Sequence, residues 1–135
     1  HRSMLLGPQR ISESARQQAP LVLVGGTAQW LDSWMGHLSV FAQQRRVLIY
    51  ETRGQAGGFY KPLETTAPPR QFDYSVCDLP QHAHDFMAVV DAAGMLHEPF
   101  DCVGFSFGGR VAMSAATSAN LPMRKLCVTG VAADR

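Results

Sequence analysis

The sequence lacks a long apolar segment. No run of apolar residues approaches the length needed to cross a membrane, so we expect no membrane span. The chain starts at His1, without the methionine, charged start and apolar stretch that mark a secretory signal. We therefore expect that a targeting peptide is either absent or already missing from these residues.

Charge and cysteine are also limited. The 12 Lys and Arg residues against 11 Asp and Glu residues give a net charge of +1, which argues against nucleic acid as a partner. The three cysteines, Cys77, Cys102 and Cys127, are odd in number and have no metal-ligand spacing. This favours no metal site and a reducing, intracellular location, the cytoplasm or an organelle. We expect Cys102 and Cys127 inside buried strands, where a thiol packs as a small apolar group.

Two phosphate-binding patterns are incomplete. The segment Gly104–Gly109 has the glycine spacing of a P-loop, but Arg110 and Val111 stand where Lys and Ser or Thr are required. The pair Gly25-Gly26 lacks the third glycine of a dinucleotide-binding loop. We therefore expect no nucleotide and no other cofactor.

What the sequence does contain is typical of one globular domain. Its 135 residues allow one domain at most, and 46% of them are hydrophobic and 17% are charged. Short continuous apolar runs predict strands that are buried on both faces. The predicted strands are Leu21–Val24, Arg46–Tyr50, the run that begins at Phe100, and Met123–Val128, with a possible strand end at Ser3–Leu6. Residues 59–73 hold three prolines and predict a surface excursion.

Helix signals separate these strands. Asp32 or Ser33 is predicted to cap a first helix, and Asp78 is predicted to cap a second helix that ends at Gly94. The apolar side of the first helix is Trp34, Leu38 and Phe41, and that of the second is Leu79, Ala83, Phe86, Met87, Val90 and Ala93. Alternating strands and helices imply parallel strands, right-handed crossovers and helices on both faces. The predicted fold is an α/β three-layer sandwich with a mostly parallel sheet.

The pentad Gly104-Phe105-Ser106-Phe107-Gly108 has the pattern G-x-S-x-G, between an apolar run and a series of small, helix-tolerant residues. A strand followed at once by a helix, with one Ser at the corner, is the context of a nucleophile elbow. There the Ser takes a positive φ, and a Cβ two residues before or after it would clash. Gly109 lets the helix lie close to its neighbour, and the N–H groups of the helix start face the corner. As a bare pattern, the pentad also occurs by chance in glycine-rich loops.

From about Leu21 to the C-terminus, the chain resembles the first part of an α/β-hydrolase-fold protein. Four features in the correct order carry this resemblance: Gly25-Gly26 after a buried strand, where the family often has His-Gly, the Tyr-Glu-Thr-Arg-Gly-Gln run at Tyr50–Gln55, the helix start at Asp78-Leu79, and the elbow at Gly104–Gly109. The elbow is specific only in context, but the four together are a strong match.

The resemblance implies a site at the carboxyl edge of the sheet. The strand that ends at Val24 should lie beside the strand that ends at Gly104. Ser106 would be the catalytic nucleophile, and the backbone N–H groups of Thr27 and Phe107 would form the oxyanion hole. The implied function is a serine hydrolase that acts on an ester or a related acyl bond of a small-molecule substrate.

The sequence also departs from the family pattern. Gly25 replaces the commoner His, which would change how the oxyanion loop is held. Ala56 is extra before Gly57, so the alignment of that loop stays open. Arg53 in the same loop is expected to pair with a local carboxylate rather than to act in catalysis.

No His follows Ser106, although the family places the base and its orienting acid after the nucleophile. His82 and His84 are expected to face solvent, and His37 and His97 to be surface or satisfied residues. Asp134 lies where a minority of the family place the acid, but it could equally start a loop with an ion pair. We therefore expect a partial α/β-hydrolase domain over residues 1–135, inactive alone and without the last strands, lid and catalytic His. The alternative is a non-catalytic scaffold of this fold that binds a small ligand or a protein partner.

Overall fold

A five-stranded sheet runs through the middle of the protein. The computed structural model describes residues 3–7, 18–54 and 77–131. The strands are β1 (Ser3–Leu6), β2 (Leu21–Val24), β3 (Val47–Tyr50), β4 (Phe100–Phe105) and β5 (Met123–Thr129), in the spatial order β1-β3-β2-β4-β5. β2 to β5 run parallel, whereas β1 pairs with β3 in the antiparallel direction. The mostly parallel sheet is therefore confirmed, and the segment Ser3–Leu6 is a strand.

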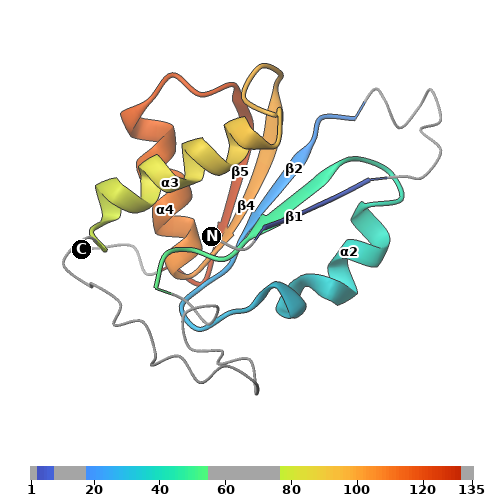
Figure 1. Cartoon of the computed structure of the whole chain (residues 1–135), viewed down its shortest axis with the longest axis horizontal. Coiled ribbons are helices and arrows are strands. Elements are labelled where there is room, and N and C mark those ends of the chain that lie inside the picture. Colours follow the sequence, from blue (N-terminus) through green and yellow to red (C-terminus); the bar gives the residue numbers. More distant parts are fainter. Residues whose placement is uncertain (1–2, 8–17, 55–76, 132–135) are drawn as a thin grey trace, which may run out of the picture.

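Helices cover both faces of this sheet (Figure 1). On one face lie α3 (Leu79–Ala92) and α4 (Phe107–Ser118), which also pack against each other. On the other face lies α2 (Met35–Phe41), which continues the short 3-10 helix η1 (Leu31–Trp34). This arrangement confirms the predicted three-layer α/β sandwich.

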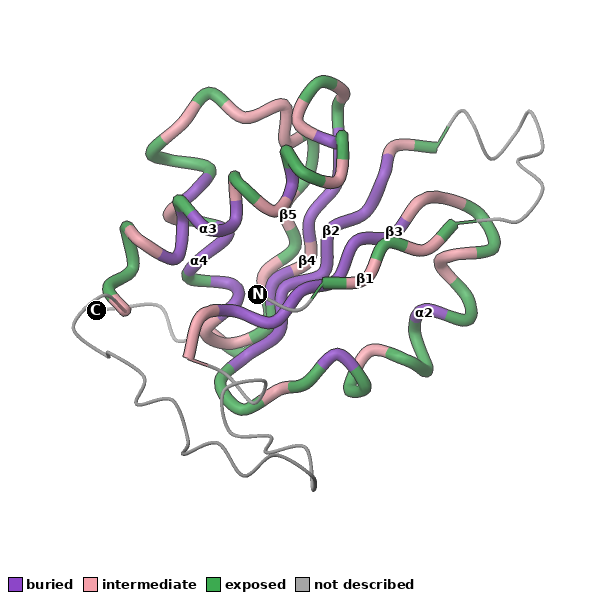
Figure 2. Tube along the Cα trace, viewed as in Figure 1, coloured by how far each residue is buried: buried purple, intermediate pink, exposed green. Residues whose placement is uncertain are grey.

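The central strands are buried because a helical layer lies on each side of them (Figure 2). In β2, Val22 and Val24 belong to the core under α3 and α4, whereas Leu21 and Leu23 belong to the core under η1 and α2. All four side chains are 5% exposed or less. A strand with two covered faces has no polar side, which explains its continuous apolar run.

The second predicted helix begins and ends as the sequence indicates. Asp78 Oδ1 accepts a hydrogen bond from Gln81 N at 2.8 Å, so the predicted cap is confirmed. The chain leaves the helix through Gly94, whose φ is 68°. The predicted apolar side of the first helix also faces the core: Leu38, with Trp34 and Phe41 packed beside it.

The predicted cap at Asp32 or Ser33 is wrong. Both residues lie inside η1, and neither η1 nor α2 starts with a side-chain cap hydrogen bond. The first N–H groups find other acceptors instead. Leu31 N donates to the buried carboxylate of Glu51 at 3.4 Å, and Ser33 N donates to Trp30 O at 3.0 Å. A local cap is dispensable here because a carboxylate from the end of a neighbouring strand takes its place.

β5 is the edge strand of the sheet in the described part of the chain, and one of its faces is covered. Leu126 packs against the core under α3 and α4, whereas Cys127 is exposed. The prediction that Cys127 is buried is therefore wrong, while Cys102 on the doubly paired β4 is buried as predicted. Three predicted features lie outside the described residues: the excursion at 59–73, the alignment at Ala56 and Gly57, and Asp134.

Candidate active site

Ser106 lies at the turn between β4 and α4, directly before the first residue of the helix. Its backbone has φ 52° and ψ −121°, a conformation that costs a residue with a Cβ on the order of 1–3 kcal/mol. Its N–H donates to Thr129 O at the end of β5 at 2.8 Å, and its carbonyl accepts from Gly109 N at 2.9 Å. The edge strand and the helix thus hold both backbone polar groups of Ser106, and the positive φ expected from the sequence is present.

Two glycines allow this turn because a side chain would not fit at either position. A Cβ at Gly104 would lie 2.5 Å from Gly109 Cα, and a Cβ at Gly108 would lie 2.3 Å from Val24 O. Both distances are far below van der Waals contact, so the predicted clashes are confirmed. At Gly109 the close neighbour is β5, since a Cβ there would lie 2.7 Å from the side chain of Val128.

The loop after β2 passes directly beside Ser106. β2 and β4 are adjacent parallel strands, with Val24 opposite Gly104, as predicted. A Cβ at Gly26 would lie 3.0 Å from Ser106 Cβ. The next residue, Thr27, is exposed. The structure therefore brings the glycine loop and the serine together at the carboxyl edge of the sheet.

Two backbone N–H groups flank this contact, those of Thr27 and Phe107. No described residue accepts a hydrogen bond from either of them. Phe107 is the first residue of α4, so its N–H belongs to the unpaired first turn, where the helix dipole is positive. Donors of this kind can bind an anionic oxygen.

Gln29 closes the loop after β2, a role that the sequence did not predict. Its side-chain Oε1 accepts a hydrogen bond from Gly26 N at 2.6 Å, and its backbone N–H donates to Gly26 O at 3.2 Å. The only signal in the sequence is an amide side chain three residues after a glycine. Such pairs are too common in loops to stand out without the fold.

His82 is buried, so the prediction that it faces solvent is wrong. Its residue exposure is 3%, and its ring meets the ring of Phe107 edge-on, with centroids 4.9 Å apart and planes at 85°. It lies on the buried side of α3 with Ala83 and Phe86. Burial lowers the pKa of His82 below its ordinary value, although the nearby Asp85 acts in the opposite direction. The imidazole is therefore neutral near pH 7. The other three described histidines are exposed: His37, His84 and His97.

Arg53 pairs with a carboxylate, as predicted, but the prediction that this carboxylate is local is wrong, because Asp85 lies 32 residues further along the chain. Arg53 reaches from the loop after β3 to Asp85 on α3 through hydrogen bonds of 2.8 and 2.7 Å. Gln81 adds a third hydrogen bond to Asp85 at 3.2 Å. Burial acts to raise the pKa of Asp85, but the hydrogen bonds from Arg53 and Gln81 outweigh it, and the pKa lies below its ordinary value. This ion pair ties the β3 loop to α3.

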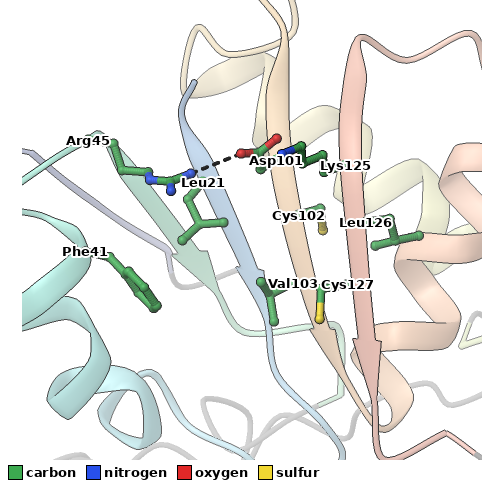
Figure 3. Close-up of a pocket in the computed structure, with 9 residues that line it drawn as sticks. All are labelled: Leu21, Phe41, Arg45, Asp101, Cys102, Val103, Lys125, Leu126 and Cys127. Atoms are coloured by element: carbon green, nitrogen blue, oxygen red, sulfur yellow. Dashed lines mark hydrogen bonds and ion pairs between the residues drawn. The ribbon is translucent and has the colours of Figure 1, made fainter. Parts of the chain in front are cut away.

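A cavity of about 560 Å³ lies beside β2, β4 and β5 (Figure 3). It is lined by residues of these strands, by Phe41 of α2 and by Arg45, which lies between α2 and β3. Its carboxylate, Asp101, accepts a hydrogen bond from Arg45 at 3.1 Å and two from Arg124 at 2.9 and 2.8 Å. Asp101 lies opposite Leu21, at the amino end of β2. Ligands of open α/β sheets bind at the carboxyl ends of the strands, so this cavity is separate from the candidate site.

Across residues 3–7, 18–54 and 77–131, no cluster of three His, Cys, Asp or Glu side chains could hold a metal ion. The helices within these ranges fall short of a membrane span in length and apolar character.

Sequence comparison places this fold in a known family. The family model for the alpha/beta hydrolase fold matches residues 19–133. The chain belongs to the alpha/beta hydrolase fold family. No curated protein sequence matches this chain.

Solved structures share the fold of this chain at low sequence identity. MenH from S. aureus is 15% identical with a TM-score of 0.70, over 96% of this chain and 42% of that protein. A hydrolase from Pseudomonas aeruginosa PA01 is 21% identical with a TM-score of 0.68, over 97% and 42%. A thermophilic esterase from Thermogutta terrifontis is 20% identical with a TM-score of 0.70, over 98% and 40%. The chain thus spans about two fifths of the length of these structures.

Proposed function

We propose that this chain is the first part of a serine hydrolase that cleaves an ester or a related acyl bond of a small substrate through Ser106. The observation that carries the proposal is the turn at Ser106, a residue with a Cβ held at φ 52° between a strand and a helix, beside Gly26. Backbone strain at a single polar residue is characteristic of functional sites. In this family, the same turn is the nucleophile elbow.

In the proposed reaction, the Oγ of Ser106 attacks the carbonyl carbon of the acyl group. Negative charge then collects on the carbonyl oxygen, and the N–H groups of Thr27 and Phe107 donate hydrogen bonds to it. Such preorganised donors lower the barrier by about 3–4 kcal/mol each. The leaving group departs with a proton, and water then hydrolyses the acyl-serine to release the acid and restore the hydroxyl.

The proton of Ser106 must pass to a general base, which we propose comes from residues outside the 135 of this chain, together with its orienting acid. The sequence has no His after Ser106, where this family places it. His82 is not a substitute, because it is buried with its ring against Phe107. Without a base, a serine is a weak nucleophile at neutral pH. We therefore expect the 135-residue chain to be inactive by itself.

Neighbours in fold support an acyl bond as the target. The esterase from Thermogutta terrifontis has a TM-score of 0.70, and Est816, an N-acyl homoserine lactone degrading enzyme, has a TM-score of 0.66. Both are 20% identical to this chain, so their activities are their own. They support a class of bond and no particular substrate.

A fluorophosphonate probe tests the proposal on the full-length protein, because it reacts covalently with an activated serine. We expect labelling of the wild type and none of Ser106→Ala. Ser33→Ala, which removes an exposed hydroxyl on η1, is the matched control and should be labelled fully. Hydrolysis of p-nitrophenyl acetate should follow the same pattern. Turnover by the 135-residue chain that disappears in Ser106→Ala would contradict the proposal that the general base lies outside these residues.

The alternative is a hydrolase-like scaffold that binds a small ligand or a protein partner at the same edge of the sheet. A fold alone does not determine chemistry, and a full-length sequence without a Gly-x-His-like turn late in the chain would favour this alternative. A folded full-length protein that the probe leaves unlabelled would support this alternative over the hydrolase.

A further inference from the structure

The loop after β2 is held without the histidine that the family often has there. Gly25 takes that position, and a Cβ on it would lie 3.2 Å from both Cβ and Oε1 of Gln29. The same Cβ would lie 3.4 Å from Trp34 Nε1. The space beside Gly25 is therefore filled by the side chain of Gln29 and the edge of the Trp34 indole.

Gln29 binds both backbone polar groups of Gly26. Gly26 N donates to the side-chain Oε1 of Gln29 at 2.6 Å, and Gly26 O accepts from the backbone N–H of Gln29 at 3.2 Å. Between these two residues, Ala28 has φ 60°, which costs a residue with a Cβ about 1–2 kcal/mol. Such a conformation persists only where the surrounding contacts hold it. The two hydrogen bonds of Gln29 close the turn around Ala28.

This arrangement occupies the N–H of Gly26 and leaves that of Thr27 without an acceptor among the described residues. A Cβ at Gly26 would lie 3.0 Å from Ser106 Cβ, so the loop and the serine are in close contact. A shift of Gly26 would move the Thr27 donor relative to Ser106.

We propose that Gln29 is a positioning residue, whose side-chain amide fixes Gly26 so that Thr27 N–H is presented to the carbonyl oxygen of the substrate. The inference rests on the proposed function and names the residue that holds the oxyanion loop in place of the missing histidine. In this role Gln29 acts through the backbone of Gly26, which its side chain and its backbone N–H both bind.

Steady-state kinetics of the full-length protein with p-nitrophenyl acetate tests this role. Gln29→Met keeps the length of the side chain and removes the acceptor. We expect kcat to fall about 10- to 100-fold because the donor is misplaced, with KM changed less than about twofold. Gln29→Glu keeps an acceptor oxygen and should recover most of kcat. Gln43→Met removes an exposed amide just after α2 and should match the wild type.

The outcomes separate this role from a structural one and from the proposed function. The melting temperature of each variant shows whether kcat changes without loss of the fold, as the proposal requires. A wild-type kcat in Gln29→Met overturns the positioning role, and so does an equal loss of kcat in Gln29→Glu. A raised KM at unchanged kcat also overturns it. If Ser106→Ala keeps full activity, the proposed function fails; if Ser106→Ala is inactive and Gln29→Met is fully active, only the positioning role fails.

Discussion

Gly108 packs backbone against backbone on Val24, and a Cβ at Gly108 would lie 2.3 Å from Val24 O. The first turn of α4 therefore begins directly on the end of β2. Because Gly108 follows Ser106 by two residues, this contact sets the distance between the serine turn and the loop that starts at Gly25. A backbone carbonyl cannot rotate away as a side chain can, so the contact is rigid.

We expect Gly108→Ala to destabilise the protein by about 3 kcal/mol, because the new methyl group would displace backbone rather than a side chain. Urea denaturation of the full-length protein measures the free energy of unfolding. Gly36→Ala is the matched control, since Gly36 lies in α2 with nothing within 4 Å of an added Cβ. It should stabilise the helix by up to about 1 kcal/mol. Equal free energies of unfolding for Gly108→Ala and the wild type would contradict the close approach.

We expect Ser106→Gly to be more stable than Ser106→Ala by up to about 1 kcal/mol. Both variants lose the hydroxyl, but alanine keeps the Cβ at φ 52° while glycine adopts this region without strain. The gain is smaller than the strain because glycine also gains entropy in the unfolded chain. Thermal unfolding of the two variants measures the difference. A less stable Ser106→Gly would show that the turn is not strained.

The stability of the protein should fall as the pH drops below about 6.5 because of His82. Burial lowers its pKa in the folded state from the ordinary value of 6.5, so the unfolded chain binds the proton first as the pH falls. Above pH 7 both states are neutral, and His82 adds no pH dependence. Asp85 titrates in a lower window, because its pKa is depressed from 3.8. Urea denaturation at a series of pH values between 5 and 8 measures how the free energy of unfolding changes with pH. This change should be smaller in His82→Leu than in the wild type, and His84→Leu, at an exposed position, is the control. The same pH dependence in His82→Leu as in the wild type would contradict the burial of a neutral imidazole.

We expect Arg53→Met to destabilise the protein by about 2–3 kcal/mol. The Asp85 side chain is 8% exposed, and it would keep its charge while losing two hydrogen bonds. The Arg53 side chain is 27% exposed, so solvent screens the ion pair and makes the loss of stability smaller than for a fully buried pair. Arg46→Met breaks the surface pair with Glu98, where both partners are more exposed, and should cost less than about 1 kcal/mol. Equal losses in the two variants, measured by urea denaturation, would show that the Arg53 pair does not tie the β3 loop to α3.

The strands and the turn at Ser106 could be predicted because each depends on a local pattern. The run Leu21–Val24 has no polar residue, which only a doubly covered strand tolerates. The glycines at 104 and 108 surround a single Ser at the end of a strand, and the clashes in the structure explain both. The catalytic roles of Ser106, Thr27 and Phe107 stay predictions, which labelling and kinetics can test.

The burial of His82, the exposure of Cys127 and the start of η1 could not be predicted because they depend on neighbours that are distant in the sequence. His82 lies on the side of α3 that packs against α4. A polar imidazole in the sequence does not indicate that its helix face is buried. Cys127 is exposed because its strand is at an edge in the described sheet. Leu31 N donates to the carboxylate of Glu51, which directly follows β3. No cap signal near Leu31 in the sequence reveals this acceptor.

The hydrogen bond from Ser106 N to Thr129 O has a consequence for the order in which the protein is made. All of α4 and the rest of β5 are synthesised before this acceptor, because Thr129 is the last residue of β5. The serine turn therefore cannot form this hydrogen bond until Thr129 has been synthesised, 23 residues after Ser106. The turn gains this contact only when β5 pairs with β4, so a nascent chain that stops before Thr129 carries the pentad without one of the contacts that hold it.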